Sequence, residues 1–168
     1  MDEVFEFRSI KREEAEEAVE IEMICFPPNE ACKRENMIER IEKAPEYFLV
    51  AFDKEKGKIA GFLNGISTNE TVFRDEFFTD INTHIPGEKN VMLLGLDVRP
   101  EYRGAHLATE IVKKYCNLAQ NLGADRMVLT CHDEKIKMYE KMGFKDLGIS
   151  ASVWGKEVWH DMDIVLSD

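Results

Sequence analysis

The amino-acid sequence predicts a single α/β domain over residues 1–168, with a sheet of about seven strands flanked by about four helices. A length of 168 residues and a hydrophobic content of 44% are typical of one domain that buries a sizeable core. Strand-like and helix-like segments alternate along the whole chain. At the centre, a strand at 91–98, a helix at 104–122 and a strand at 126–131 form a βαβ unit, whose strands should be parallel with a right-handed crossover.

The first part of the chain predicts one strand and two helices. Residues 4–10 alternate apolar and polar side chains, as a half-buried strand does. Residues 12–25 show helical spacing until Pro27, because proline lacks a backbone donor and restricts the residue before it. A second helix is predicted over 30–43, and Pro45 ends it.

The middle of the chain predicts a hairpin, a partly helical stretch and a long helix. Residues 47–53 and 58–66 form a hairpin-like pair of strands around a polar turn that contains glycine. Residues 69–89 are long for a loop, so part of this stretch should be helical. In the 104–122 helix apolar residues recur at helical spacing, and Gly123 provides a C-terminal stop.

The end of the chain predicts a short helix and two strands. The helix covers residues 134–142, and the strands cover about 144–152 and 157–166. These elements would complete the sheet beyond the parallel strand at 126–131.

The charge and hydropathy of the chain exclude several classes of partner. A net charge of −11 argues against nucleic acid, because binding to phosphates needs a basic surface. The same charge is compatible with attraction of a cationic amine. No apolar run approaches the roughly 20 residues that span a bilayer, and the acidic, polar N-terminal segment is unlike a signal peptide. We therefore predict a cytoplasmic protein without a membrane partner.

The four cysteines do not predict a disulfide framework or a metal site. Cys25, Cys32, Cys116 and Cys131 include no CxxC pair and are sparse for a chain of this length. Reduced thiols in a cytoplasmic protein are the simplest interpretation. The sequence therefore predicts no bound metal.

The segment LGLDVRPEYRGAHLA, residues 94–108, predicts an anion site. An apolar strand turns at Arg99, and Arg103 and Gly104 then open a helix. The first backbone N–H groups of a helix lack intrahelical partners, and the helix dipole places partial positive charge there. Arg103 adds a planar donor fork suited to phosphate. An ordinary strand-to-helix corner with a surface arginine remains the alternative.

Two motifs resemble those of a known family. VRPEYRGAHLA is followed by KMYEKMGF, and this pair is similar to the GNAT superfamily of acetyl-coenzyme A-dependent N-acetyltransferases. The segments CFPPNEA, APEYFLVA and GISASVWGKEVWHDMDI further resemble the serotonin (arylalkylamine) N-acetyltransferase branch. The resemblance implies a GNAT-like mixed, mainly antiparallel sheet around the central parallel βαβ unit.

The resemblance implies a binding site for acetyl-CoA as co-substrate. Backbone amides of the loop before the central helix would hold the diphosphate, and the pantetheine arm would pair with the preceding strand, where a backbone N–H would polarise the acetyl carbonyl. His106 stands where the family usually has glycine, and we expect it to keep a negative φ and still donate its N–H. The implied cofactor contacts are Leu96, Asp97, Val98, Arg103, Gly104, Ala105, His106, Leu107, Ala108, His132 and Lys135.

The resemblance also implies catalytic residues. Tyr139 matches the family tyrosine that protonates the leaving sulfur. The branch uses two strand histidines as the base, but Met92 and Leu94 occupy those positions. The candidate bases are Asp97 and His84. Asp97 lies on the same strand, but its side chain should point to the opposite face from positions 92 and 94 unless a β-bulge changes its direction. A water chain to bulk solvent is the alternative.

Substrate contacts are expected from two segments. Phe26, Pro27 and Pro28 resemble the mobile loop that closes over aromatic amines in that branch, and Glu70 precedes the strand near the thioester. The acidic stretch after Glu70 also contains aromatic residues: Phe73, Phe77 and Phe78. These side chains form either an apolar substrate pocket with acidic residues at its opening or only the buried face of an amphipathic helix.

The predicted function is acetyl transfer from acetyl-CoA to a small primary amine, arylalkylamine or polyamine-like, by direct attack in a ternary complex. A protein lysine or N-terminal acetyltransferase is one alternative. A non-catalytic acetyl-CoA-binding module is another, motivated by His106 and by the missing strand histidines. A monomer or a homodimer is expected.

Overall fold

A computed structural model describes residues 1–166 and contains one seven-stranded sheet in the order β1-β2-β3-β4-β5-β7-β6. The pair β4–β5 is parallel and every other pair is antiparallel. The predicted mixed sheet with a central parallel unit is therefore confirmed. The strands are β1 (Phe5–Ser9), β2 (Phe48–Asp53), β3 (Lys58–Thr68), β4 (Asn90–Val98), β5 (Arg126–Cys131), β6 (Lys145–Ile149) and β7 (His160–Val165).

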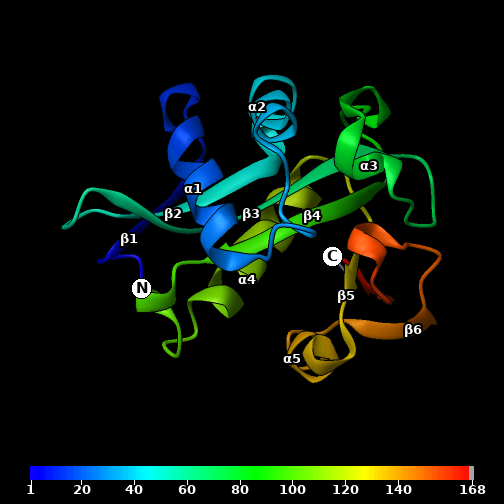
Figure 1. Cartoon of the computed structure of the whole chain (residues 1–168). Coiled ribbons are helices and arrows are strands. Elements are labelled where there is room, and N and C mark those ends of the chain that lie inside the picture. The colour runs from blue at the N-terminus through cyan, green and yellow to red at the C-terminus, as the bar shows by residue number, and fades with distance from the viewer. Residues whose placement is uncertain (167–168) are drawn as a thin grey trace.

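The helices cover both faces of the sheet (Figure 1). One face carries α1 (Ala15–Cys25), α2 (Arg34–Lys43) and the single turn α3 (Glu76–Thr79). The other carries α4 (Leu107–Asn121) and α5 (Ile136–Lys141). The apolar face of α4 packs on the sheet through Ile111, Val112 and Tyr115, so the helical spacing seen in the sequence is the spacing of its buried side.

Several elements are shorter than predicted. The helix expected over 30–43 begins at Arg34, and the helix expected over 104–122 begins at Leu107. The strand expected over 144–152 ends at Ile149, and a loop with one 3₁₀ turn precedes β7. Residues left out of these elements lie in the loops 26–33, 99–106 and 150–159.

Strands β4 and β5 diverge soon after they pair. Their parallel ladder covers Asn90, Val91 and Met92 on β4, and both strands continue beyond it without pairing to each other. From Leu93 onward, the edge of β4 that is not paired with β3 therefore faces open space instead of β5. This divergence opens the sheet in its middle.

A β-bulge in β4 changes which face its later side chains occupy. Asn64 pairs with Gly95, whereas the next residue, Gly65, pairs with Leu93, so Leu94 is an extra residue in β4. Beyond the bulge Asp97 shares a face with Met92 and Leu94, the face that α1 and α2 cover. The β-bulge that the sequence analysis named as a condition is therefore present, and it turns the Asp97 side chain to the face covered by α1 and α2.

Two further expectations concern cysteines and membranes. All four cysteines are free thiols, as predicted. Among residues 1–166, every helix is too short or too polar to cross a bilayer.

Candidate active site

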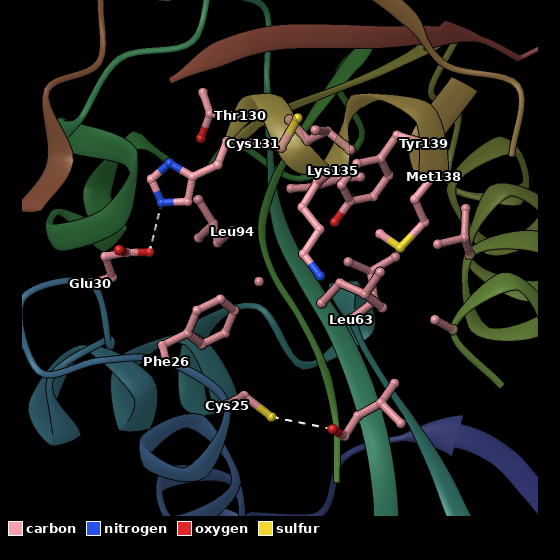
Figure 2. Close-up of a pocket in the computed structure, with 18 of the residues that line it drawn as sticks. Cys25, Phe26, Glu30, Leu63, Leu94, Thr130, Cys131, Lys135, Met138 and Tyr139 are labelled. Atoms are coloured by element: carbon pink, nitrogen blue, oxygen red, sulfur yellow. Dashed lines mark hydrogen bonds and ion pairs between the residues drawn. The ribbon is translucent and has the colours of Figure 1, made fainter. Parts of the chain in front are cut away.

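A cavity of about 940 Å³ lies where β4 and β5 diverge. Its walls come from both sides of the sheet: Glu22 and Cys25 of α1 on one side, and Leu107 and Val112 of α4 on the other. Figure 2 shows Cys25, Phe26 and Glu30 along one wall and Lys135, Met138 and Tyr139 along the opposite one, with Leu94 between them. The cavity therefore connects the two faces through the opening in the sheet.

The N-terminus of α4 forms part of the α4-side wall. Gly104, His106, Leu107 and Ala108 line the cavity there, all of them predicted cofactor contacts. The first N–H groups of a helix point outward from its end, so this wall presents donors and the positive end of a helix dipole. Ala105, also predicted to contact the cofactor, is exposed and lies outside the lining.

His106 does not have the negative φ expected of it. It caps α4 with φ 64° and ψ 20°, in the left-handed region. Only a few per cent of non-glycine residues adopt this conformation, although histidine is enriched among them. The turn into α4 therefore has a backbone shape that glycine adopts without strain, and histidine adopts it with strain of about 1 kcal/mol.

Replacing His106 with glycine should stabilise the protein. Because glycine has no Cβ penalty at positive φ, His106→Gly is expected to raise the free energy of unfolding by about 0.5 kcal/mol, after allowance for the greater freedom of glycine in the unfolded chain. Urea unfolding monitored by circular dichroism measures the change. Gly104→Ala, at φ 86°, is the matched control and should shift stability in the opposite direction. A destabilised His106→Gly variant would contradict the strain argument.

Arg103 points back toward the end of β4. Its Nε donates to the carbonyl oxygen of Val98 at 3.0 Å, and Nη2 lies 3.5 Å from the Sγ of Cys25. The Cys25 thiol donates to the same carbonyl at 3.4 Å. The fork expected to bind phosphate is thus partly used at the end of β4, which leaves the backbone N–H groups of the helix N-terminus as the main free donors on this wall.

Lys135, which immediately precedes α5, and Tyr139, which lies within α5, both reach the cavity. In Figure 2 the Tyr139 hydroxyl and the Lys135 ammonium both point into the open space. The ring of Tyr139 packs edge-on against Phe144, with centroids 5.7 Å apart. Burial raises the pKa of Tyr139 above its ordinary value of 10, so the hydroxyl keeps its proton.

Two buried carboxyl groups meet beneath the opposite wall. Glu22, 4% exposed, lines the cavity, and Asp97, fully buried, lies behind it. Both oxygens of Asp97 and Oε1 of Glu22 lack a hydrogen-bond partner among the described residues, while Glu22 Oε2 accepts from the Cys32 N–H at 2.9 Å. Burial, and then the neighbouring Glu22, raise the pKa of Asp97 well above 3.8.

Besides Asp97 and Ala105, three predicted residues lie outside the cavity lining. His84 accepts a hydrogen bond from the Ser67 N–H at its Nδ1, 3.0 Å away, and its ring packs on Tyr47, so it is directed into the core. Glu70 is held by Arg74 through two hydrogen bonds of 2.7 and 2.8 Å. Pro28 is exposed, whereas its neighbours Phe26 and Pro27 line the cavity.

The loops 26–33 and 150–159 meet above the cavity. The indole N–H of Trp154 donates to the Glu30 carbonyl at 2.8 Å, and the Asn29 side chain donates to the Gly155 carbonyl at 3.0 Å. The ring of Phe78 packs on Trp154, with centroids 4.6 Å apart. Of the three phenylalanines in the acidic stretch, only Phe78 lines the cavity; Phe73 and Phe77 are core residues.

Sequence reasoning missed several residues of this site. Glu22 stands four residues after buried Ala18 and three before Cys25, so a carboxylate on the buried stripe of a helix was the available signal. Arg40, 3% exposed and lining the cavity, stands next to Ile41 on the buried side of α2. Trp154 and Trp159 gave no such signal, because core packing explains tryptophans in closing strands equally well.

The chain is similar to known proteins over most of its length. The family model described as acetyltransferase (GNAT) family matches residues 15–144. A curated relative, "Probable hydrolase YhcX" of Bacillus subtilis (strain 168), is 25% identical over 130 residues, which are 73% of this chain and 25% of the relative. This chain therefore spans about a quarter of the length of that relative.

Solved structures share the fold. The GphF GNAT-like decarboxylase in complex with isobutyryl-CoA has a TM-score of 0.82 and 16% identity, covering 96% of this chain and 100% of its own. The phosphinothricin acetyltransferase of Sinorhizobium meliloti in complex with acetyl-CoA has a TM-score of 0.68 and 15% identity, covering 98% and 89%. At such identities the likeness shows the fold alone.

Proposed function

The chain belongs to the acetyltransferase (GNAT) family, and on this premise we propose that it transfers an acetyl group from acetyl-CoA to a small primary amine, arylalkylamine or polyamine-like. One observation carries the proposal. The cavity at the β4–β5 divergence joins a helix N-terminus and a tyrosine on one side to a buried carboxyl pair on the other. An acyl donor and an acceptor could therefore approach the same point from opposite faces, as direct transfer requires.

The donor side supplies binding groups for acetyl-CoA. The N-terminal amides of α4, from Leu107 onward, would hold its phosphates, with the Lys135 ammonium as an added positive charge. The open edge of β4, at Leu96 and at the Val98 N–H, would hydrogen-bond the pantetheine arm as an added strand does. The Val98 carbonyl already accepts from Arg103 and Cys25. A backbone N–H on that edge would polarise the thioester carbonyl.

The acceptor side supplies a base and an acid for the transfer. An alkylammonium of pKa about 10.4 must lose a proton before its nitrogen attacks. We assign that proton to Glu22, on the cavity wall, with Asp97 behind it sharing the proton, since burial and the neighbouring Glu22 raise the pKa of Asp97 and a raised carboxyl pKa suits a base. Tyr139 then gives its proton to the departing thiolate as the carbon–sulfur bond breaks. The new carbon–nitrogen bond becomes the amide, and the second proton that the nitrogen loses returns to the Tyr139 oxygen.

The acceptor end favours a small amine over a protein. Hydrogen bonds between the loops 26–33 and 150–159 cross above the cavity, which restricts access for a folded partner. The enclosed walls carry flat aromatic surface from Phe26, Phe78 and Trp154, and carboxylates from Glu22 and Glu30. Aromatic faces and carboxylates together attract an organic ammonium ion.

Tyr139→Phe tests the proposal in a free-thiol release assay with acetyl-CoA and tryptamine, phenethylamine, spermidine, putrescine or a lysine peptide. The wild type should release coenzyme A with one class of small amine. The variant should lower kcat about 10²-fold, at the lower end of the range for acid catalysis, because a thiolate of pKa about 8.5 also leaves without protonation. Binding of acetyl-CoA, measured by calorimetry, should not change.

Tyr47→Phe is the control, because its hydroxyl accepts from the Gly87 N–H outside the cavity. Equal turnover of wild type and Tyr139→Phe would remove the acid role. Turnover with the lysine peptide alone would favour the protein acetyltransferase. Acetyl-CoA binding without turnover on any amine would favour the binding module.

A further inference from the structure

Three side chains from distant parts of the chain meet at the opening of the cavity through which we propose that the amine enters, called here the acceptor mouth. Glu30 lies in the loop after α1, His132 follows β5, and Glu157 lies in the loop before β7. One ligand atom of each lies within 4.8 Å of the other two. Among the described residues, this is the one group of three histidine, cysteine or acidic side chains brought to such spacing.

The orientation of the His132 ring is set by its neighbours. Its Nδ1 lies 3.2 Å from the carbonyl oxygen of Val158, which can only accept, so Nδ1 carries a proton. The ring stacks on Trp159, with centroids 4.0 Å apart and planes at 21°. A histidine whose outer N–H is held by a carbonyl presents the lone pair of its other nitrogen, which is the arrangement that orients metal-ligating histidines.

The free nitrogen faces another acceptor. His132 Nε2 lies 3.2 Å from Oε1 of Glu30, and a carboxylate oxygen cannot donate. Two acceptors at this distance need a cation or a proton between them. The contact itself therefore points to a positively charged occupant.

The donors and charges of the cluster suit a divalent cation. Within residues 1–166, neither Glu30 nor Glu157 forms an ion pair with lysine or arginine. A dication compensates both and accepts the imidazole lone pair.

We propose that Glu30, His132 and Glu157 form a binding site for a divalent first-row transition cation of the zinc type. One imidazole and two carboxylates are donors that such cations take, and water fills the remaining position. The cation joins the loop 26–33, the end of β5 and the loop 150–159 at the acceptor mouth. This proposal does not depend on acetyl transfer, because it concerns binding alone.

Calorimetric titration of the whole chain with Zn²⁺, and absorption spectra with Co²⁺, test the site. One zinc ion per chain should bind, and Co²⁺ should give the visible bands of a four-coordinate site. His132→Phe keeps the stack on Trp159 but has no lone pair, and Glu157→Gln removes an exposed carboxylate; each should weaken binding at least 10-fold. Circular dichroism checks that both variants are folded.

The control is a second histidine–carboxylate contact in the same protein. His160 Nδ1 lies 3.1 Å from Asp146 Oδ1 but, within residues 1–166, has no third ligand at that spacing, so His160→Phe should bind zinc as the wild type does. Absence of stoichiometric binding at micromolar zinc would overturn the proposal. So would zinc binding that survives His132→Phe and Glu157→Gln but is lost in Cys25→Ser or Cys32→Ser.

Discussion

An Asp97→Asn variant is expected to lose amine acetylation by about 10²- to 10³-fold in kcat/KM and yet to unfold at a higher urea concentration than the wild type at pH 8. The loss of activity follows because asparagine cannot share the proton that Glu22 takes from the amine. The gain in stability follows because a fully buried carboxyl group with unpartnered oxygens is replaced by a side chain that does not ionise.

The pH dependence of this effect has a definite sign. The pKa of Asp97 is raised on folding, so the folded protein binds this proton more tightly than the unfolded chain does. Its contribution to stability is fully present below the unfolded pKa of about 3.8. It is lost as the pH rises through the folded pKa. The advantage of Asp97→Asn should therefore be absent at acid pH and grow toward alkaline pH.

Urea unfolding at several pH values, together with a pH–rate profile, measures both consequences. Asp53→Asn is the control of opposite sign, because hydrogen bonds from Tyr102 and from the Lys56 N–H lower the pKa of Asp53. That variant should lose stability above its unfolded pKa. If Asp97→Asn lost stability and activity together, Asp97 would be a structural residue only.

Gly65→Ala is expected to cost about 3 kcal/mol of unfolding free energy, at the upper end of the range for overpacking. A Cβ at Gly65 would lie 2.7 Å from the Met92 carbonyl oxygen and 3.0 Å from the Tyr115 hydroxyl. The first contact is with backbone, so β3 and β4 would have to separate beside the bulge. The Tyr115 hydroxyl is itself fixed by donating to the Tyr47 carbonyl at 2.8 Å.

Urea unfolding at constant m-value gives the size of this loss. Gly57→Ala is the control, because a Cβ there meets no atom within 4 Å and only the φ of 66° opposes it. That variant should lose about 1 kcal/mol. A loss at Gly65 no larger than at Gly57 would mean that the two strands can move apart freely.

Local patterns were enough to predict much of the fold. The strand 126–131 was predicted with the bounds it has, and the central βαβ unit is parallel as expected, because a strand followed by an amphipathic helix and a second strand packs in one way. The helix N-terminus after Arg103 and the tyrosine of α5 were also found in the sequence, and both line the cavity. These features depend on residues that are close together along the chain.

Other features of the site could not be read from local pattern. The positive φ of His106 is imposed by the turn into α4, and the bulge at Leu94 depends on the register with β3. The bulge alone decides that Asp97 faces Glu22 and not α4, because side chains alternate strictly along an unbulged strand.

What the sequence determined by itself was therefore the order of elements, the family motifs and the helix N-terminus and tyrosine that line the cavity, since apolar spacing and turn residues act over short distances. The tertiary structure alone decided the acceptor side. Glu22 meets Asp97, and Glu30 meets His132 and Glu157, only because α1, the end of β5 and the loop before β7 pack together. Such contacts join residues far apart in the chain, and their free energy comes from burial and charge that no local pattern records.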